Sequence, residues 1–186
     1  MMDQDFPEEL VLLETAIFEG LIGADTRTWP GRFSDALKPG TDLSLVWPRF
    51  AVWMLSSDDL GLPRHADQAG KLAIGQVVAL HQRTIDADNP APSEWWAARV
   101  AASLAARSAT SSDASAAAAW AASSVAQSSV LSAVSWAILS AAQSLLLSAA
   151  QSDEWFSLRS AARAAAYVKM ADRPLALMAK APIAID

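Results

Sequence analysis

The sequence predicts an all-α protein, either a helical bundle or a short α-solenoid. The segment from Ser93 to Arg173 contains neither glycine nor proline and is dominated by alanine, the residue with the highest helix propensity. Before Ser93, apolar residues recur at spacings of three and four between breaks that contain glycine or proline. We therefore expect helices along most of the chain.

The first half of the chain predicts three helices. Acidic first turns, apolar spacing and terminal glycines or polar loops place them at about 5–20, 43–55 and 65–83. Pro48 is compatible with the second helix because it lies in the first turn, where its missing N–H is not needed. Leu72 belongs to the apolar stripe of the third helix, which ends before the polar loop DADNPAP.

The second half predicts three longer helices, at about 93–108, 113–151 and 153–170. Ser93, which precedes Glu94, is the expected N-cap of the first. The middle helix is expected to break near Ser128 and Ser129. Its serines can bond the carbonyl four residues back, which satisfies their hydroxyls inside a helix.

An alanine- and serine-rich repeat of sixteen residues is visible in the C-terminal half. We divide the sequence into consecutive segments of sixteen residues that begin at residues 96, 112, 128, 144 and 160. The sixth residue of every segment is alanine, and Trp120 and Trp136 are each the ninth residue of their segment. Small side chains at regular spacing allow helices to approach closely. We expect an acidic N-terminal part, 1–92, and a repeat part, 93–186, that together form one compact domain.

Composition and charge argue against several classes of function. The chain has 20 acidic and 14 basic residues, a net charge of −6, and so lacks the concentrated positive field that a nucleic acid requires. It contains no cysteine, which excludes disulfides and thiolate metal sites. The start MMDQDF does not resemble a secretory signal. A cytoplasmic protein with no nucleic-acid partner is expected.

The segment from Ala114 to Ser152 carries no charge. Its most apolar window, 130–149, contains five serines and Gln143, and a membrane-spanning helix needs a more continuous apolar run. We therefore expect no membrane span. A charge-free helix is instead buried in the protein core or forms an interface, including one with a second copy of the chain.

No catalytic, cofactor-binding or metal-binding motif is recognisable in the sequence. His65 and His81 are sixteen residues apart, which places them on nearly opposite faces of one helix, so they cannot chelate one ion together. His65 is more simply explained as a residue near a helix start, and His81 as one that interacts with the dipole or the terminal carbonyls at a helix end. An enzyme site formed by His65, Asp67 and His81 remains the weaker alternative.

Tryptophan and arginine are the residue types that most often dominate binding at protein interfaces. The chain has eight tryptophans, and on alanine-rich helices such large rings fill the space beside small neighbours. Arginines in the second half can pair with the acidic first half or present one face to an anionic partner. The candidate interface residues are Trp95, Trp96, Arg99, Trp120, Trp136, Trp155, Arg159 and Arg163.

Three segments, VWPRFAVWML, LHQRTIDADNPAPSEWWAARVAA and the final helix ending in KMADRPLALM, resemble a loose group of bacterial and phage helical proteins rich in alanine, tryptophan and arginine. That group includes candidate immunity proteins. The resemblance implies a non-catalytic protein that binds another protein, for example to neutralise a toxin or in a phage or mobile-element context. A self-assembling structural protein is the alternative.

Overall fold

The computed structural model confirms an all-α helical bundle. It describes residues 6–60, 62–109, 113–146 and 155–183, and the side chains of 143–146, 155 and 156 lie outside this description. The helices in chain order are α1 (Glu8–Gly20), α2 (Ala24–Ala36), α3 (Val46–Ser56), α4 (Leu62–His65), α5 (Gln68–Ile85), α6 (Pro92–Ser108), α7 (Asp113–Val125), α8 (Val130–Leu146) and α9 (Trp155–Ala179). None of the described helices has the length and apolar character needed to cross a bilayer.

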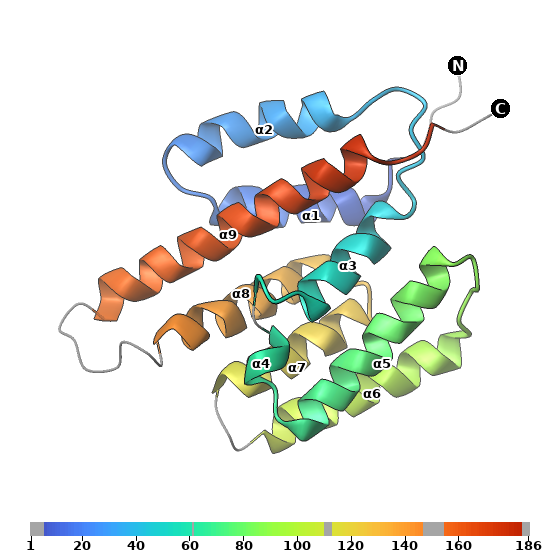
Figure 1. Ribbon diagram of the computed structural model, residues 1–186, viewed down its shortest axis with the longest axis vertical. Coiled ribbons are helices and arrows are strands. Elements are labelled where there is room, and N and C mark those ends of the chain that lie inside the picture. The colour runs from blue at the N-terminus through green and yellow to red at the C-terminus, as the bar shows by residue number, and fades with distance from the viewer. Residues whose placement is uncertain (1–5, 61, 110–112, 147–154, 184–186) are drawn as a thin grey trace.

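The helices stack in layers (Figure 1). The antiparallel pair α5 and α6 lies at one end, the pair α7 and α8 lies in the middle, and α1 and α9 cover the other side of α8. Helix α2 lies outermost against α9, while α3 and the short α4 connect the layers. An isolated bridge between Thr41 and Ile183 ties the end of the chain to the segment before α3.

Helix α7 lies at the centre of the bundle. It contacts α3, α4, α5, α6 and α8, and Ala118, Ala121 and Ala122 on it are completely buried. Alanine allows this because its methyl group lets several helix axes approach one helix at short distance. The neutral segment that begins at Ala114 is therefore mainly core along α7.

Buried serines hold α7 to its neighbours by bonds between helices. The hydroxyls of Ser103 and Ser123 lie 2.8 Å apart, and the Ser140 hydroxyl donates to the Ala114 carbonyl at 3.0 Å. The Asp67 backbone N–H donates to Ser115 Oγ at 3.0 Å. These serines therefore also form bonds to other helices, in addition to the bonds along their own helix that the sequence allows.

The observed helix bounds agree with the predicted ones where a run of apolar residues at helical spacing ends at a recognisable break. Helices α1 and α3 form as expected, and the break between α7 and α8 falls at Ser128, which has a positive φ of 55°. Helix α2 was not expected, because it contains Pro30 and Gly31. It forms because Trp29 and Phe33, one turn apart, are buried together with ring centroids 5.6 Å apart.

Two further helix ends differ from expectation. Helix α6 begins at Pro92 with Ala91 as its N-cap, so Ser93 lies inside the first turn. No side chain at the N-cap accepts a hydrogen bond here; instead the Glu94 carboxylate accepts the Ala91 N–H at 2.8 Å. Helix α9 continues through Pro174 to Ala179, because the buried Met178 secures its last turns in the core.

An Ala121→Leu substitution is expected to destabilise the protein. The position is completely buried on α7, and extra methylenes in a tightly packed core typically cost about 1–3 kcal/mol. The control is Ala97→Leu on the exposed side of α6, for which a change within about 0.5 kcal/mol is expected. Urea unfolding followed by circular dichroism measures both, and equal stability of the two variants would contradict the central position of α7.

Candidate functional site

Three large apolar side chains of the α5–α6 hairpin are exposed to solvent. Leu72 is 62% exposed, Trp96 65% and Leu104 59%. The rings of His81 and Trp95, 4.8 Å apart between centroids, fix the register of the two antiparallel helices. Leu72 precedes His81 by as many residues as Leu104 follows Trp95, so Leu72 and Leu104 lie at the same level of the hairpin. Leu72 is therefore not a core residue, contrary to its place in the predicted stripe.

The charges beside these residues are positive. Arg99 and Arg107 are exposed and form no salt bridge with any described residue. The acid of the same helix, Glu94, already pairs with Arg83 at 2.6 Å, and this hydrogen bond lowers the pKa of the carboxyl. We refer below to the α6 surface, which consists of Leu72, Trp96, Arg99, Leu104 and Arg107.

Trp120 and Trp136 extend the α6 surface onto the central helices. Their rings stack with centroids 6.1 Å apart and planes inclined by 25°. The Arg107 guanidinium lies 6.0 Å from the centre of the Trp120 ring, a cation–π arrangement that links α6 to the stack. Both tryptophans are half-buried, so they contribute to packing between α6, α7 and α8 and remain partly accessible at its edge.

The two adjacent tryptophans of α6 have different surroundings. Successive helix residues point about 100° apart, so the inward position of Trp95 leaves Trp96 outside. Trp95 contacts His81, which also lies edge-on to Trp47 with centroids 6.5 Å apart. Among the candidate interface residues, Trp95 therefore belongs to the core side of α6 and Trp96 to the exposed side.

His81 is a buried imidazole between these aromatic rings. It is only 5% exposed, and neither ring nitrogen has a hydrogen-bond partner among the described residues. Burial lowers the pKa of His81 to about 4, because the charged form is poorly solvated there. The expectation that His81 interacts with the terminal carbonyls of its helix is therefore wrong.

The structure does not bring His65, Asp67 and His81 together. His65 lines a cavity of about 230 Å³ with Asp58 and Lys169, whereas Asp67 is the N-cap of α5 and accepts a backbone N–H of its first turn at 2.8 Å. Since a helix rises about 1.5 Å per residue, His81 lies about 20 Å along α5 from Asp67. No group of three or more His, Asp or Glu side chains in the described part of the chain could hold a metal ion.

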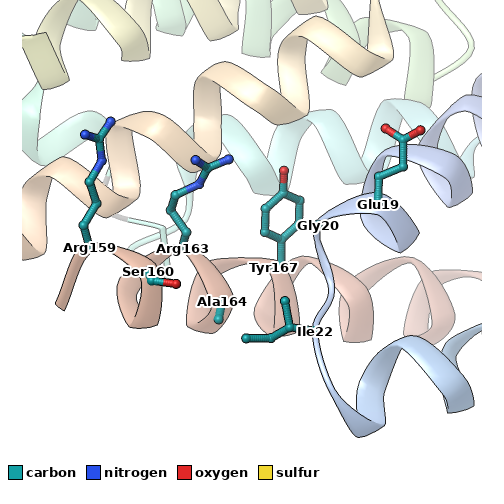
Figure 2. A pocket seen from close by; sticks show the side chains of 8 residues that line it. All are labelled: Glu19, Gly20, Ile22, Arg159, Ser160, Arg163, Ala164 and Tyr167. Carbon is teal, nitrogen blue, oxygen red and sulfur yellow. The ribbon is translucent and has the colours of Figure 1, made fainter. Parts of the chain in front are cut away.

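Arg159 and Arg163 line a separate pocket of about 560 Å³ between α1 and α9. Figure 2 shows both guanidinium groups and the Tyr167 hydroxyl extending from the same side of α9, with Glu19 on the neighbouring α1. The Tyr167 ring packs directly on the backbone of Gly20. The pocket therefore combines charges of both signs, and its arginines are distant in the fold from the α6 surface.

Several residues of the α6 surface were not among the candidates from the sequence. Leu72 and Leu104 were missed because apolar residues at helical spacing predict burial, and only the packing of the hairpin shows otherwise. Trp155 was a candidate, but its side chain lies outside the described residues. Comparisons of the chain with protein-family models, with curated proteins and with solved structures gave no match.

The burial of His81 predicts that stability falls at mildly acidic pH. The pKa is about 4 in the folded protein and near the ordinary 6.5 when unfolded, so the unfolded state binds more protons between these values. The free energy of unfolding should therefore be fully retained above pH 6.5 and decrease by up to about 1.4 kcal/mol per unit as the pH falls below it.

Urea unfolding between pH 7 and pH 5 measures this dependence. His81→Leu should flatten the slope, whereas the control His65→Gln, at a less buried histidine, should retain most of it. If the free energy of unfolding of His81→Leu depends on pH as strongly as that of the wild type, a group other than His81 causes the dependence.

The contact between Gly20 and Tyr167 gives a second prediction. A Cβ at residue 20 would lie 2.0 Å from two carbons of the ring, so Gly20→Ala must displace Tyr167, and we expect a loss of about 1–3 kcal/mol. In α5, Gly75→Ala meets no heavy atom within 4 Å and should stabilise the helix by about 0.5–1 kcal/mol. Thermal or urea unfolding of the two variants tests the difference in sign.

Proposed function

We propose that this chain is a non-catalytic protein-binding protein of the cytoplasm and that its partner docks on the α6 surface. The observation that carries this proposal is the exposure of Leu72, Trp96 and Leu104, each about 60%, on one helical hairpin. Single exposed apolar residues are ordinary on a folded domain, whereas several large ones gathered on one hairpin support an interaction site there. Tryptophan and arginine, both present here, are the side chains most enriched at binding hot spots.

The charges of the α6 surface favour an acidic partner. Arg99 and Arg107 lie beside the exposed apolar side chains, and the one acid of α6 is already paired with Arg83. A complementary surface would have an apolar centre for Trp96 and Leu104, with carboxylates placed to meet the guanidinium groups. An immunity-type role, in which the bound protein is a toxin or a phage or mobile-element protein, is the setting that the sequence resemblance favours.

Self-assembly through the same surface is the second candidate. It is supported by the exposed apolar side chains, but a two-fold symmetric contact would bring the patch that holds Arg99 and Arg107 against the same positively charged patch of another copy. Like charges facing each other are unfavourable, so a different protein fits this surface better than a second copy does. An enzyme that uses His65, Asp67 and His81 is weaker still, because α5 separates the two histidines.

The test compares two exposed sites of similar character. Trp96→Glu changes the α6 surface, and Ile22→Glu changes a residue that is 63% exposed and distant from it. Both variants should unfold at nearly the wild-type urea concentration, since exposed substitutions rarely change stability by more than about 0.5 kcal/mol. Light scattering at several concentrations first establishes whether the wild type self-associates.

Tagged proteins are then used to recover partners from a lysate of the source organism. We expect wild type and Ile22→Glu to recover the same protein in stoichiometric amount, and Trp96→Glu to recover at least about tenfold less. Equal recovery by all three, or no stoichiometric partner for the wild type, would contradict the proposal. A wild-type oligomer that Trp96→Glu dissociates would instead assign the surface to self-assembly.

A further inference from the structure

The pocket of about 560 Å³ between α1 and α9 contains charges of both signs that are not paired with each other. Its volume is in the range of small-molecule sites, about 300–1,000 Å³. Glu19 and Arg163 line it, and neither side chain forms an ion pair or a hydrogen bond with a described residue. Arg159, one turn before Arg163, is engaged in another contact. One charge of each sign therefore remains for a ligand.

The hydroxyl of Tyr167 lies between these two charges. Arg163 and Tyr167 are four residues apart and are therefore neighbours on one face of α9. The Tyr167 ring packs on the backbone of Gly20, the residue that follows Glu19. In Figure 2 the carboxylate, the hydroxyl and the guanidinium accordingly extend in the same direction, with the hydroxyl in the middle. The three groups thus face one space.

The Tyr167 hydroxyl is a polar group in need of a partner. The residue is only 9% exposed, yet the hydroxyl has no hydrogen bond to any described residue. It is not enclosed by the core, as the indole nitrogen of Trp29 is, but opens to the pocket that Tyr167 lines. Polar groups of buried residues are normally hydrogen-bonded. A hydroxyl can accept from an ammonium group and donate to a carboxylate at the same time.

The position of Glu19 favours a cation beside it. Glu19 lies in the last turn of α1, where the backbone carbonyls already give a negative partial charge, and that turn contains no basic residue. A carboxylate is unfavourable there unless a positive group accompanies it. On the other side of the hydroxyl, the Arg163 guanidinium presents parallel N–H donors that match a carboxylate. The two ends of the pocket therefore select opposite charges.

We infer that this pocket binds a small zwitterion of the α-amino-acid class. Its ammonium group lies at Glu19, its carboxylate lies at Arg163, and the Tyr167 hydroxyl bonds to both. Arg163 and Tyr167 are about one helix turn, roughly 5–6 Å, apart along α9, a spacing that leaves room for one such molecule between the two charges. This site is independent of the α6 surface, because α1 and α9 lie on the other side of α8 from the hairpin.

Glycine, alanine, leucine and phenylalanine are suitable probes, because they share the two charges and differ in the size of the side chain. For the tightest of them, the N-acetyl derivative lacks the positive charge and the amide derivative lacks the negative charge. Titration calorimetry on the whole chain measures binding. We expect saturable binding of at least one amino acid, and at least about tenfold weaker binding of both derivatives.

A second readout places the ligand in the pocket. Tyr167 is the one tyrosine of the chain, so protein labelled at the tyrosine ring gives NMR signals of this residue alone. We expect these signals to shift with the same concentration dependence as the calorimetric titration. Binding that leaves them unchanged would lie elsewhere on the protein and would overturn the inference.

Variants assign the two ends of the ligand. Arg163→Gln should weaken the amino acid by at least about tenfold and leave the weaker binding of its amide unchanged. Glu19→Gln should weaken the amino acid and leave its N-acetyl derivative unchanged. Tyr167→Phe, which keeps the ring on Gly20, should weaken the amino acid by about three- to tenfold. Lys71→Gln, at an exposed lysine of α5, should bind as wild type does.

The inference is overturned if none of the four amino acids binds at millimolar concentration, or if either derivative binds as tightly as its parent. It is also overturned if Arg163→Gln and Lys71→Gln bind the amino acid equally well. Loss of all binding through misfolding is recognised by circular dichroism, and Tyr167→Phe then decides the question. None of these results depends on a protein partner, so this test and that of the α6 surface can fail separately.

Discussion

The close packing of other helices around α7 is the constraint on which the rest of the fold depends. Helix α7 is surrounded by α3, α4, α5, α6 and α8, and only side chains as small as alanine and serine leave room for all of them. Small side chains bury little apolar area each, so their burial contributes little free energy to offset an unpaired polar group. The buried serine hydroxyls must therefore form hydrogen bonds. Ser103, Ser115 and Ser140 do this through bonds that also fix the positions of neighbouring helices.

This arrangement moves the large side chains to the margins of the central layer. Trp120 and Trp136 stack where α7 and α8 meet the solvent, and Arg107 covers one of them from α6. Because the inner face of α6 is occupied by alanines against α7 and by Trp95 against His81, Trp96 has no place inside. The exposure of Trp96 is thus a consequence of how the core is built, and it supports the proposed docking role.

Much of the fold could be predicted from the sequence, because alanine content, breakers and apolar spacing act locally. The breaks before α7 and at Ser128 were predictable for this reason. Helix α2 was not, since its burial of Trp29 and Phe33 outweighs the penalty of Pro30 and depends on contacts with distant segments. The candidate sites were predictable only in part. Trp96 and Arg99 are among the predicted interface residues, but the apolar spacing places Leu72 in the core. Glu19 and Arg163 are far apart in the sequence, and only the packing of α1 against α9 brings them to one pocket.

Native-state hydrogen exchange tests the central claim most directly, because it reports the stability of each helix separately. If α7 is the helix around which the others pack, its amides from Ala117 to Val125 should exchange only through global unfolding. Amides of the peripheral α2 should exchange through local opening at lower free energy. Exchange of α7 as fast as that of α2 would contradict this account, because it would mean that the bundle can open at α7 without unfolding.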